Sequence, residues 1–352
     1  MNREELVCDS FLRETTVRLM RGQDLTGPEA EEFFHALLAA RTNDAQIVAA
    51  LVALAIKGET TEELVGMASA MRSRAVRVSS SHLRFVDTAG TGTSAAKSFN
   101  VSTAAAFVIA GAGLPVAKHG ARAVTSRAGS ADVLEALGVN TKASPENAER
   151  CLREHGICFL FAPLFHPAAA RVARLRRQLG LRTVFNLLGP LVNPMRAPFQ
   201  LLGVWSESSL KRIASALARL GTEKAWVVHG SDGLDEITLC GETKVAACCA
   251  SAVESFSISP RDFGLEPRAF DALRGGGPEE NADLIRALLT NGKSARLTSA
   301  RDLVLMNAAA ALHLAAMAPD LLSATALARE SIASGRAAAK LEALIRETNC
   351  TP

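Results

Sequence analysis

The chain has 352 residues, of which 48% are hydrophobic and 21% are charged, and its formal net charge is +3. This length allows one large or two medium domains with a substantial buried core. So small a net charge gives no support for the clustered basic surface that a nucleic-acid or membrane partner usually requires, and we expect neither partner.

The N-terminal sequence does not resemble a secretory signal. MNREELVCDSFLRE carries acidic residues near its start and no continuous apolar segment, so we expect a cytoplasmic protein. The seven cysteines are scattered and form no CxxC pair, which indicates reduced thiols.

Residues 1–76 are predicted to form a small helical domain. Thr26 with Glu29 and Thr60 with Glu63 have the spacing of capping boxes. The apolar residues of DAQIVAALVALAIKG repeat at helical intervals before Gly58 ends the pattern.

Residues 80–352 are predicted to form a larger α/β domain. LRFVDTAGTG reads as a strand that ends in glycines, and it is followed by a helix from Ser102, the strand LPVAKHG and the helix SADVLEALG. Ser144 and Pro145 predict the start of the helix SPENAERCLREHG. Further strands are predicted in GICFLFAP, QLLGVWS and AWVVHG, then an antiparallel pair in EITLCGETKVAACC and ESFSISP, and finally two long alanine-rich helices. The predicted fold class is α/β, with a central mixed sheet flanked by helices beside the helical domain.

The first candidate site is the stretch GTGTSAAKSFNVST, residues 90–103. Gly90 and Gly92 follow a predicted strand, so their backbone N–H groups can approach a phosphate at the start of the next helix. The pattern is neither G-x-G-x-x-G nor a P-loop, and a plain tight turn explains GTG about as well.

The neighbouring residues favour the phosphate site. Polar residues follow within a few positions, and a lysine and a histidine end the next predicted strand: Lys97, Ser98, Asn100, Ser102, Thr103, Lys118 and His119. Because the ligand crevice of an open α/β sheet lies outside the carboxyl ends of its strands, these residues predict a phosphorylated substrate.

Three other features could contribute to such a site. Asp235 and Glu236 follow a predicted strand and suit Mg²⁺ bound with substrate phosphate, although a surface turn is the alternative. RLRRQLGLRT places four arginines where one could pair with a carboxylate or phosphate, and a solvated helix face is the alternative. His119 and His166 could act as acid or base.

Six segments, taken in order and spacing, resemble the signature series of the anthranilate phosphoribosyltransferase family over essentially the whole chain. They are GTGxxxxxSFNVSTAAAFV, VAKHGARAVTSRAGSADVLEALGV, FLFAPLFHPA, LRRQLGLRTVFNLLGPLVNP, HGSDGLDEIT and GGGPEENADLI. The resemblance implies the fold of the type III nucleoside phosphorylases and a homodimer formed through the helical part. It also implies that a segment at about 145–190 packs with the helical domain.

The resemblance further implies transfer of phosphoribose from 5-phosphoribosyl 1-pyrophosphate to anthranilate, in tryptophan biosynthesis. The implied donor-binding residues are Gly90, Thr91, Gly92, Thr93, Ser94, Ser98, Asn100, Ser102, Thr103, Lys118 and Ser130. Ser102, Asp235 and Glu236 would hold two Mg²⁺ ions. On the acceptor side, Arg176 would face the anthranilate carboxylate, with Ala121, His119 and His166 near it, and the catalytic residues would be Lys118, Arg176 and His119.

The chain departs from the family pattern in two places. Thr93 and Ser94 replace Gly and Asp of the usual GTGGD, which removes a flexible glycine and a carboxylate. Ala121 replaces the asparagine of the usual HGNR, which removes one hydrogen bond to the acceptor. The alternatives are therefore a working anthranilate enzyme, a relative with another aromatic or heterocyclic acceptor, and a nucleic-acid-binding relative without catalysis. The retained lysine, arginine and carboxylate pair favour the first.

Overall fold

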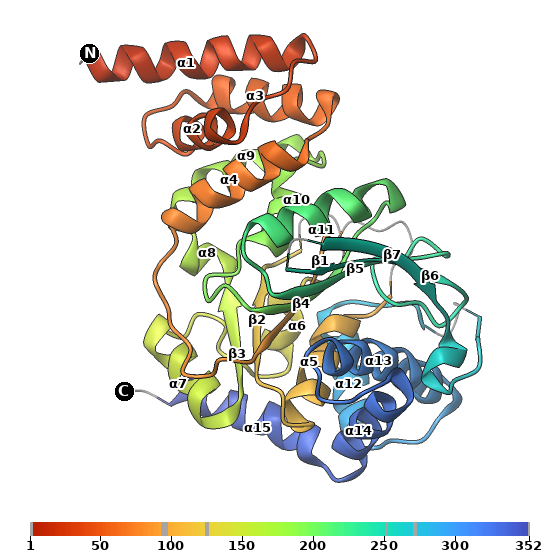
Figure 1. Cartoon of the computed structure of the whole chain (residues 1–352). Helices are drawn as coiled ribbons and strands as arrows, with labels where there is room; N and C mark the ends of the chain where they lie inside the picture. Colours follow the sequence, from red (N-terminus) through yellow and green to blue (C-terminus); the bar gives the residue numbers. More distant parts are fainter. Residues whose placement is uncertain (1–2, 93–97, 124–126, 251, 270–272, 351–352) are drawn as a thin grey trace.

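The computed structural model describes residues 3–92, 98–123, 127–250, 252–269 and 273–350, with side chains from residue 10 onward. A helical N-terminal part lies beside an α/β part that contains a seven-stranded sheet (Figure 1). The predicted fold class is confirmed.

The helical part begins with α1 (Arg3–Met20), α2 (Gly27–Leu37), α3 (Asp44–Lys57) and α4 (Thr61–Ser73). Both predicted capping boxes are present, at Thr26 with Glu29 and at Thr60 with Glu63. Each box satisfies backbone N–H groups that have no partner within the helix, and so fixes where α2 and α4 begin.

The sheet has the strand order β3-β2-β1-β4-β5-β6-β7. Its strands are β1 (Val86–Gly90), β2 (Val116–Gly120), β3 (Ile157–Phe161), β4 (Phe199–Gly203), β5 (Lys224–Gly230), β6 (Thr243–Cys249) and β7 (Ala252–Ile258). β1 to β5 pair in parallel, and β6 and β7 add as the predicted antiparallel pair. The chain moves outward from β1 in both directions, which makes the carboxyl end of β1 the expected place for a ligand crevice.

Helices cover both faces of this sheet. They are α5 (Val101–Gly111), α6 (Ser130–Ala136), α7 (Pro145–His155), α8 (Ala162–Phe165), α9 (Ala170–Leu179), α10 (Val184–Leu191), α11 (Leu210–Arg219), α12 (Pro278–Leu289), α13 (Ala295–Leu314), α14 (Leu321–Ala333) and α15 (Arg336–Asn349), with short 3₁₀ turns at Pro167–Ala169, Glu207–Ser209 and Pro260–Phe263. The chain therefore closes with three helices, α13 to α15, where the sequence predicted two. Ser334 and Gly335 separate α14 from α15, and Gly335 has the left-handed φ of 76° that interrupts a helix.

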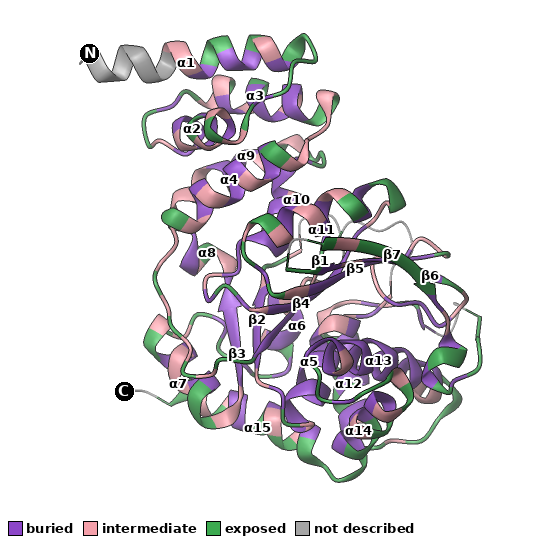
Figure 2. Ribbon diagram, in the orientation of Figure 1, coloured by how far each residue is buried: buried purple, intermediate pink, exposed green. Residues whose placement is uncertain are grey.

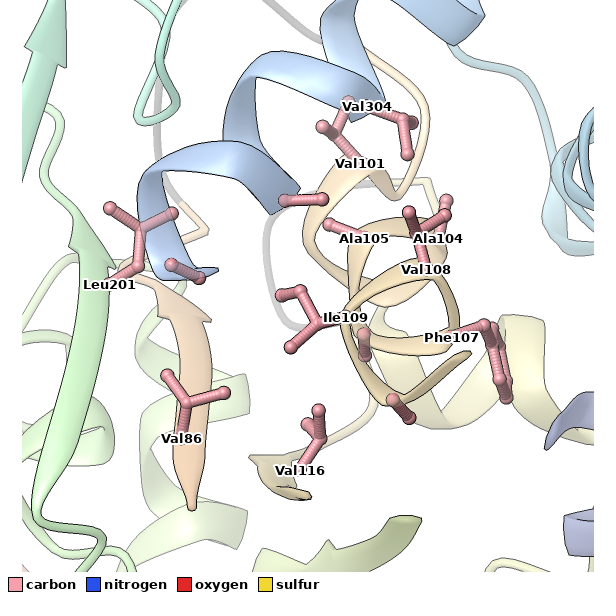
Figure 3. Close-up of a cluster of buried hydrophobic side chains, with 14 of the residues drawn as sticks. Val86, Val101, Ala104, Ala105, Phe107, Val108, Ile109, Val116, Leu201 and Val304 are labelled. Carbon is pink, nitrogen blue, oxygen red and sulfur yellow. The ribbon is translucent and has the colours of Figure 1, made fainter. Parts of the chain in front are cut away.

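The main core lies between the sheet and the buried helices α5 and α13 (Figures 2 and 3). In Figure 3, Val86 of β1, Leu201 of β4 and Val304 of α13 surround Val101 and Ile109 of α5. α5 is apolar on nearly every side, as expected of a helix enclosed by other elements. This enclosure holds the first turn of α5 at the end of β1.

A second apolar cluster joins the helical part to α9, α10 and α11. It contains Phe34 and Leu51 of the helical part together with Leu175 of α9, Phe185 of α10 and Ile213 of α11. Within the segment 145–190, α9 contacts α3 and α10 contacts α3 and α4, whereas α7 packs on β3 and α15. Among the described residues, no helix is long and apolar enough to cross a membrane.

Candidate active site

A cavity of about 280 Å³ lies at the carboxyl ends of β1 and β2. Its lining brings together most of the residues that the sequence suggested: Gly90, Thr91, Gly92, Ser98, Asn100, Ser102, Lys118, His119, Ala121, Ser130, Arg176, Asp235 and Glu236. Thr103 and His166 are described and buried, but they are not part of this lining. Thr93 and Ser94 lie outside the described residues.

Glycines allow the loop that carries Asp235 to approach the strand ends. The backbone N–H of Gly92, which has a φ of 69°, donates to Asp235 Oδ2 at 2.8 Å. A Cβ on Gly90 would lie 3.1 Å from the same oxygen, and a Cβ on Gly203 would lie 1.6 Å from the Asp235 carbonyl oxygen. The glycine loop and the acidic loop are thereby held together although they lie far apart in the sequence.

Lys118 is buried beneath this loop. Its ammonium group donates to the Thr88 carbonyl and, at 3.2 Å, to the Ser102 hydroxyl. Burial lowers the pKa of Lys118, and the negative charges of Asp87 and Glu236 oppose that change. The arrangement places a cation directly behind the first turn of α5.

The adjacent carboxylates of Asp235 and Glu236 fit a divalent cation. Desolvation, followed by the charge of Asp235, raises the pKa of Glu236 well above its usual value. A hydrogen bond from the Ser102 backbone N–H opposes this rise. A bound cation would favour the ionised form of Glu236, and carboxylate and hydroxyl oxygens are the donors that Mg²⁺ prefers. Asp235, Glu236 and Ser102 therefore form a suitable donor set.

Two polar residues border the same side of the cavity. Asn100 donates to the Ala128 carbonyl at 3.2 Å and accepts from Asn281 Nδ2 at 2.9 Å. Ser130 begins α6 beside Gly120, where a Cβ would lie 2.2 Å from the Ser130 hydroxyl oxygen. Gly120 is therefore required for this close approach.

On the other side of the cavity lies His119, whose ring centre is 5.3 Å from that of the buried His166 behind it. Desolvation lowers the pKa of His119 to about 3 and that of His166 to about 4, so both rings are neutral near pH 7. Nδ1 of His119 lies 3.0 Å from the Gly189 carbonyl oxygen and Nε2 of His166 lies 3.0 Å from the Val192 carbonyl oxygen. Since a carbonyl can only accept, these nitrogens carry the protons. Nε2 of His119 is left as a buried acceptor that has no partner in the described part of the chain.

Arg176 is the residue of the basic segment that lines the cavity. Its Nη2 donates to Asn186 Oδ1 at 3.1 Å, and its guanidinium lies 5.1 Å from the centre of the Phe185 ring. Burial lowers the pKa of Arg176 to about 10, so the group remains charged near pH 7. Arg174 instead pairs with Asp44 of α3 at 2.8 Å.

Sequence reasoning missed a buried pair beneath the cavity. Asp87 accepts from the His119 backbone N–H at 3.1 Å and from Asn193 Nδ2 at 2.8 Å. Asn193 also donates to the Ala117 carbonyl at 2.8 Å. Desolvation raises the pKa of Asp87 to about 6. In the sequence, Asp87 stands out only as a single carboxylate in a largely apolar strand. Its partner Asn193 lies 106 residues further along the chain, so no local pattern predicts the pair.

Comparison with known proteins gives full-length matches. Residues 13–75 match a family described as a glycosyl transferase helical bundle domain, and residues 82–338 match a glycosyl transferase a/b domain. A protein of Moorella thermoacetica named anthranilate phosphoribosyltransferase is 47% identical over 335 residues, which cover 95% of this chain and 98% of that protein. A protein of the same name from Myxococcus xanthus is also 47% identical, with the same shares covered.

Solved structures are similar over the same length. The crystal structure of anthranilate phosphoribosyltransferase from Thermus thermophilus has a TM-score of 0.88 at 42% identity, with 95% of this chain and 99% of that chain covered. The enzyme of Saccharomyces cerevisiae in complex with PRPP and Mg has a TM-score of 0.87 at 28% identity, with 97% and 98% covered. Another structure of the yeast enzyme contains 4-fluoroanthranilate.

Proposed function

This chain belongs to the anthranilate phosphoribosyltransferase family, and we propose from that premise how its residues divide the work of the reaction. The protein is a transferase that moves the 5-phosphoribosyl group from phosphoribosyl pyrophosphate to anthranilate, a step of tryptophan biosynthesis. The products are N-(5-phosphoribosyl)anthranilate and pyrophosphate. The observation that carries the assignment of residues is that Lys118, the acidic pair and Arg176 meet in one cavity.

The donor binds at the carboxyl end of β1. The glycine loop at the end of β1 and the first turn of α5 border the place of its phosphates. The sequence assigns Ser98, Asn100, Thr103 and Ser130 to the same group, and also Thr93 and Ser94, which lie outside the described residues. The Thr91 hydroxyl is buried and has no partner in the described residues, so it is available to a phosphate oxygen. Ser102, Asp235 and Glu236 would hold two Mg²⁺ ions, which would supply positive charge to neutralise the pyrophosphate.

The acceptor binds between α9, α10 and His119. The Arg176 guanidinium pairs with the anthranilate carboxylate, and the Phe185 ring keeps that guanidinium in place. The lone pair on His119 Nε2 accepts a hydrogen from the anthranilate amine. With a pKa of about 3, His119 orients this amine and is too weak a base to activate it strongly. Ala121 leaves room where a longer side chain could reach the acceptor.

Catalysis follows from positioning and from charge. The amine attacks C1 of the ribose while the bond to pyrophosphate breaks, through an oxocarbenium-like transition state without a covalent enzyme intermediate. The nitrogen then carries an extra, strongly acidic proton, which passes to water to give the secondary amine of the product. Lys118 stabilises the negative charge that develops on the leaving oxygen. Arg176 and His119 hold the amine nitrogen toward C1. Because the two reacting atoms are already in position, the reaction avoids the entropic cost of bringing them together from solution. We place this reaction in the cytoplasm and in a homodimer.

The assignment is tested by following the loss of anthranilate fluorescence with phosphoribosyl pyrophosphate and Mg²⁺. We expect loss with the wild-type protein and none above background with the Asp235→Asn/Glu236→Gln double variant. Glu207→Gln/Glu254→Gln removes the same charge from two exposed carboxylates and should retain wild-type rates. Full activity of the Asp235/Glu236 variant would exclude the proposed metal ligands.

A further inference from the structure

The last turn of α10 is held by four side chains, which come from α4, β2, β4 and the residue after α8. Pro190 lies inside α10 and has no N–H group, and the backbone bond from Val192 to the Gly189 carbonyl is 3.5 Å long. The carbonyls of Gly189, Pro190, Leu191 and Val192 accept in turn from His119 of β2 at 3.0 Å, Gln200 of β4 at 3.4 Å, Arg72 of α4 at 2.8 Å and His166 at 3.0 Å. The position of this turn, residues 189–192, therefore depends on tertiary contacts.

Arg72 is the contribution of the helical part to this set. Its Nε donates to the Leu191 carbonyl, and its Nη1 donates at 3.0 Å to the Leu220 carbonyl at the end of α11. One planar guanidinium thus caps two helices, whose carboxyl ends carry partial negative charge.

The described residues give Arg72 no carboxylate partner. Burial lowers the pKa of Arg72 to about 10, and the nearby positive charge of Arg196 adds to this effect. A desolvated cation without a counter-charge is costly, and the two carbonyl bonds are what offset this cost. These two bonds indicate that Arg72 holds the ends of α10 and α11 in place as well as packing between the two domains.

The geometry points to Arg72 as a positioning residue for the anthranilate site. Through Arg72, the position of the helical part sets the position of α10, which forms one side of the proposed acceptor site. This inference rests on the acceptor site proposed above. α10 supplies the lining residues Phe185, Asn186, Gly189 and Pro190. The Asn186 amide oxygen accepts from Arg176, and the Gly189 carbonyl sets the tautomer of His119.

The donor side has no such dependence on Arg72. Its residues lie on β1, β2 and α5, just before α5, at the start of α6 and on the loop after β5. The hydrogen bonds of Arg72 go instead to the ends of α10 and α11. Loss of Arg72 should consequently raise the KM for anthranilate and leave the KM for phosphoribosyl pyrophosphate nearly unchanged. A general loosening of the fold would weaken both of them.

The test compares Arg72→Met with Arg212→Met. Arg212 of α11 also joins the two domains, through a hydrogen bond to the Glu59 carbonyl, and within the described part of the chain its side chain has no hydrogen bond to a carbonyl of α10. Arg72→Met should raise the KM for anthranilate about tenfold, as expected for a lost hydrogen bond from a charged group, and leave the KM for phosphoribosyl pyrophosphate within about twofold. The KM for anthranilate of Arg72→Lys should lie between those of the wild type and Arg72→Met, because an ammonium cannot cap both carbonyls in the same planar geometry. Arg212→Met should change neither constant.

Amide hydrogen exchange gives a readout that does not require activity. The peptide covering residues 184–193 should exchange faster in Arg72→Lys than in the wild type, and in Arg212→Met it should not. If Arg72→Met fails to fold, both the KM values and the amide exchange are measured on Arg72→Lys. Equal changes in both KM values, or unchanged exchange in α10, overturn the inference. A wild type without activity would instead contradict the proposed function, and exchange in α10 would still decide the role of Arg72.

Discussion

The proposed donor side and the proposed acceptor side of the cavity belong to different parts of the molecule. Ser102 and Lys118 stand on α5 and β2, whose apolar residues belong to the main core under the sheet. Arg176 and Asn186 stand on α9 and α10, whose apolar residues belong to the cluster shared with the helical part. The donor side is therefore fixed by one core, and the acceptor side depends on how two domains meet.

This difference assigns separate roles to the two sides. Strand ends within one sheet keep their spacing because the hydrogen bonds between strands fix it, which suits charge stabilisation at the reacting bond. Helices at a domain boundary can change position when only a few contacts between the domains change. This property suits the part of the site that selects the acceptor. Substitutions on the two sides should consequently affect different kinetic constants.

The largest effect is expected for Lys118→Met. Removing the buried cation leaves the charge on the leaving pyrophosphate less stabilised, and kcat should fall by about 10²–10³-fold. Lys211→Met, at an exposed lysine of α11, is the matched control and should retain the wild-type rate. Steady-state rates at saturating substrates measure the effect. A kcat within a few-fold of wild type would remove Lys118 from the proposed mechanism.

A smaller effect, confined to one substrate, is expected for Arg176→Met. Loss of a charged hydrogen bond to the anthranilate carboxylate should raise the KM for anthranilate about 10–100-fold, with little change in donor affinity measured by calorimetry. Arg177→Met alters the neighbouring exposed arginine and serves as the control. If both substrates weaken equally, Arg176 does not face the carboxylate.

The third prediction concerns stability at low pH. Because burial lowers the pKa of His166 to about 4 in the folded state, against the ordinary value of 6.5, the unfolded state binds more protons between these two pH values. Stability contributed by the neutral ring is complete above pH 6.5 and is lost as the pH falls toward 4. Between pH 7.5 and pH 5 this loss amounts to about 2 kcal/mol.

His166→Gln keeps a donor for the Val192 carbonyl but does not titrate. Its free energy of unfolding, measured with urea at the two pH values, should therefore fall by about 2 kcal/mol less than that of the wild type. Parallel pH dependences for His166→Gln and wild type would show that His166 is not a buried neutral ring.

The smallest effect is expected for Ala121→Asn, which restores the usual family residue. One added hydrogen bond to anthranilate is worth about 0.5–1.5 kcal/mol, so the KM for anthranilate should fall about 2–10-fold. Ala121→Leu adds bulk without the amide and separates hydrogen bonding from contact. A KM that rises in both variants would indicate that the cavity cannot accommodate a longer side chain at this position.

Local sequence signals were sufficient to find the residues that line the proposed donor side of the cavity. Glycines at a strand end, a hydroxyl-rich helix start and a lysine ending the next strand each reflect geometry within about a dozen residues. The acidic pair was found because it also follows a strand, and both capping boxes were found from spacing alone. The length of the last helices was misjudged, because alanine-rich sequence continues through the break at Gly335.

The acceptor side could not be resolved in the same way. Four arginines in one segment look alike in sequence, and only the packing of α9 directs Arg174 to Asp44 and Arg176 into the cavity. Asp87 and Asn193 are also paired across the fold without any local pattern.

The sequence by itself determined the alternation of strands and helices, the capped starts of α2, α4 and α7 and the family, because these follow from periodicity, turn chemistry and motifs along the chain. Only the tertiary structure decided the protonation of His119 and His166 and the role of α10. Desolvation and the capping of carbonyls by side chains from distant elements set these properties. Such effects arise only when segments far apart in the chain exclude water together.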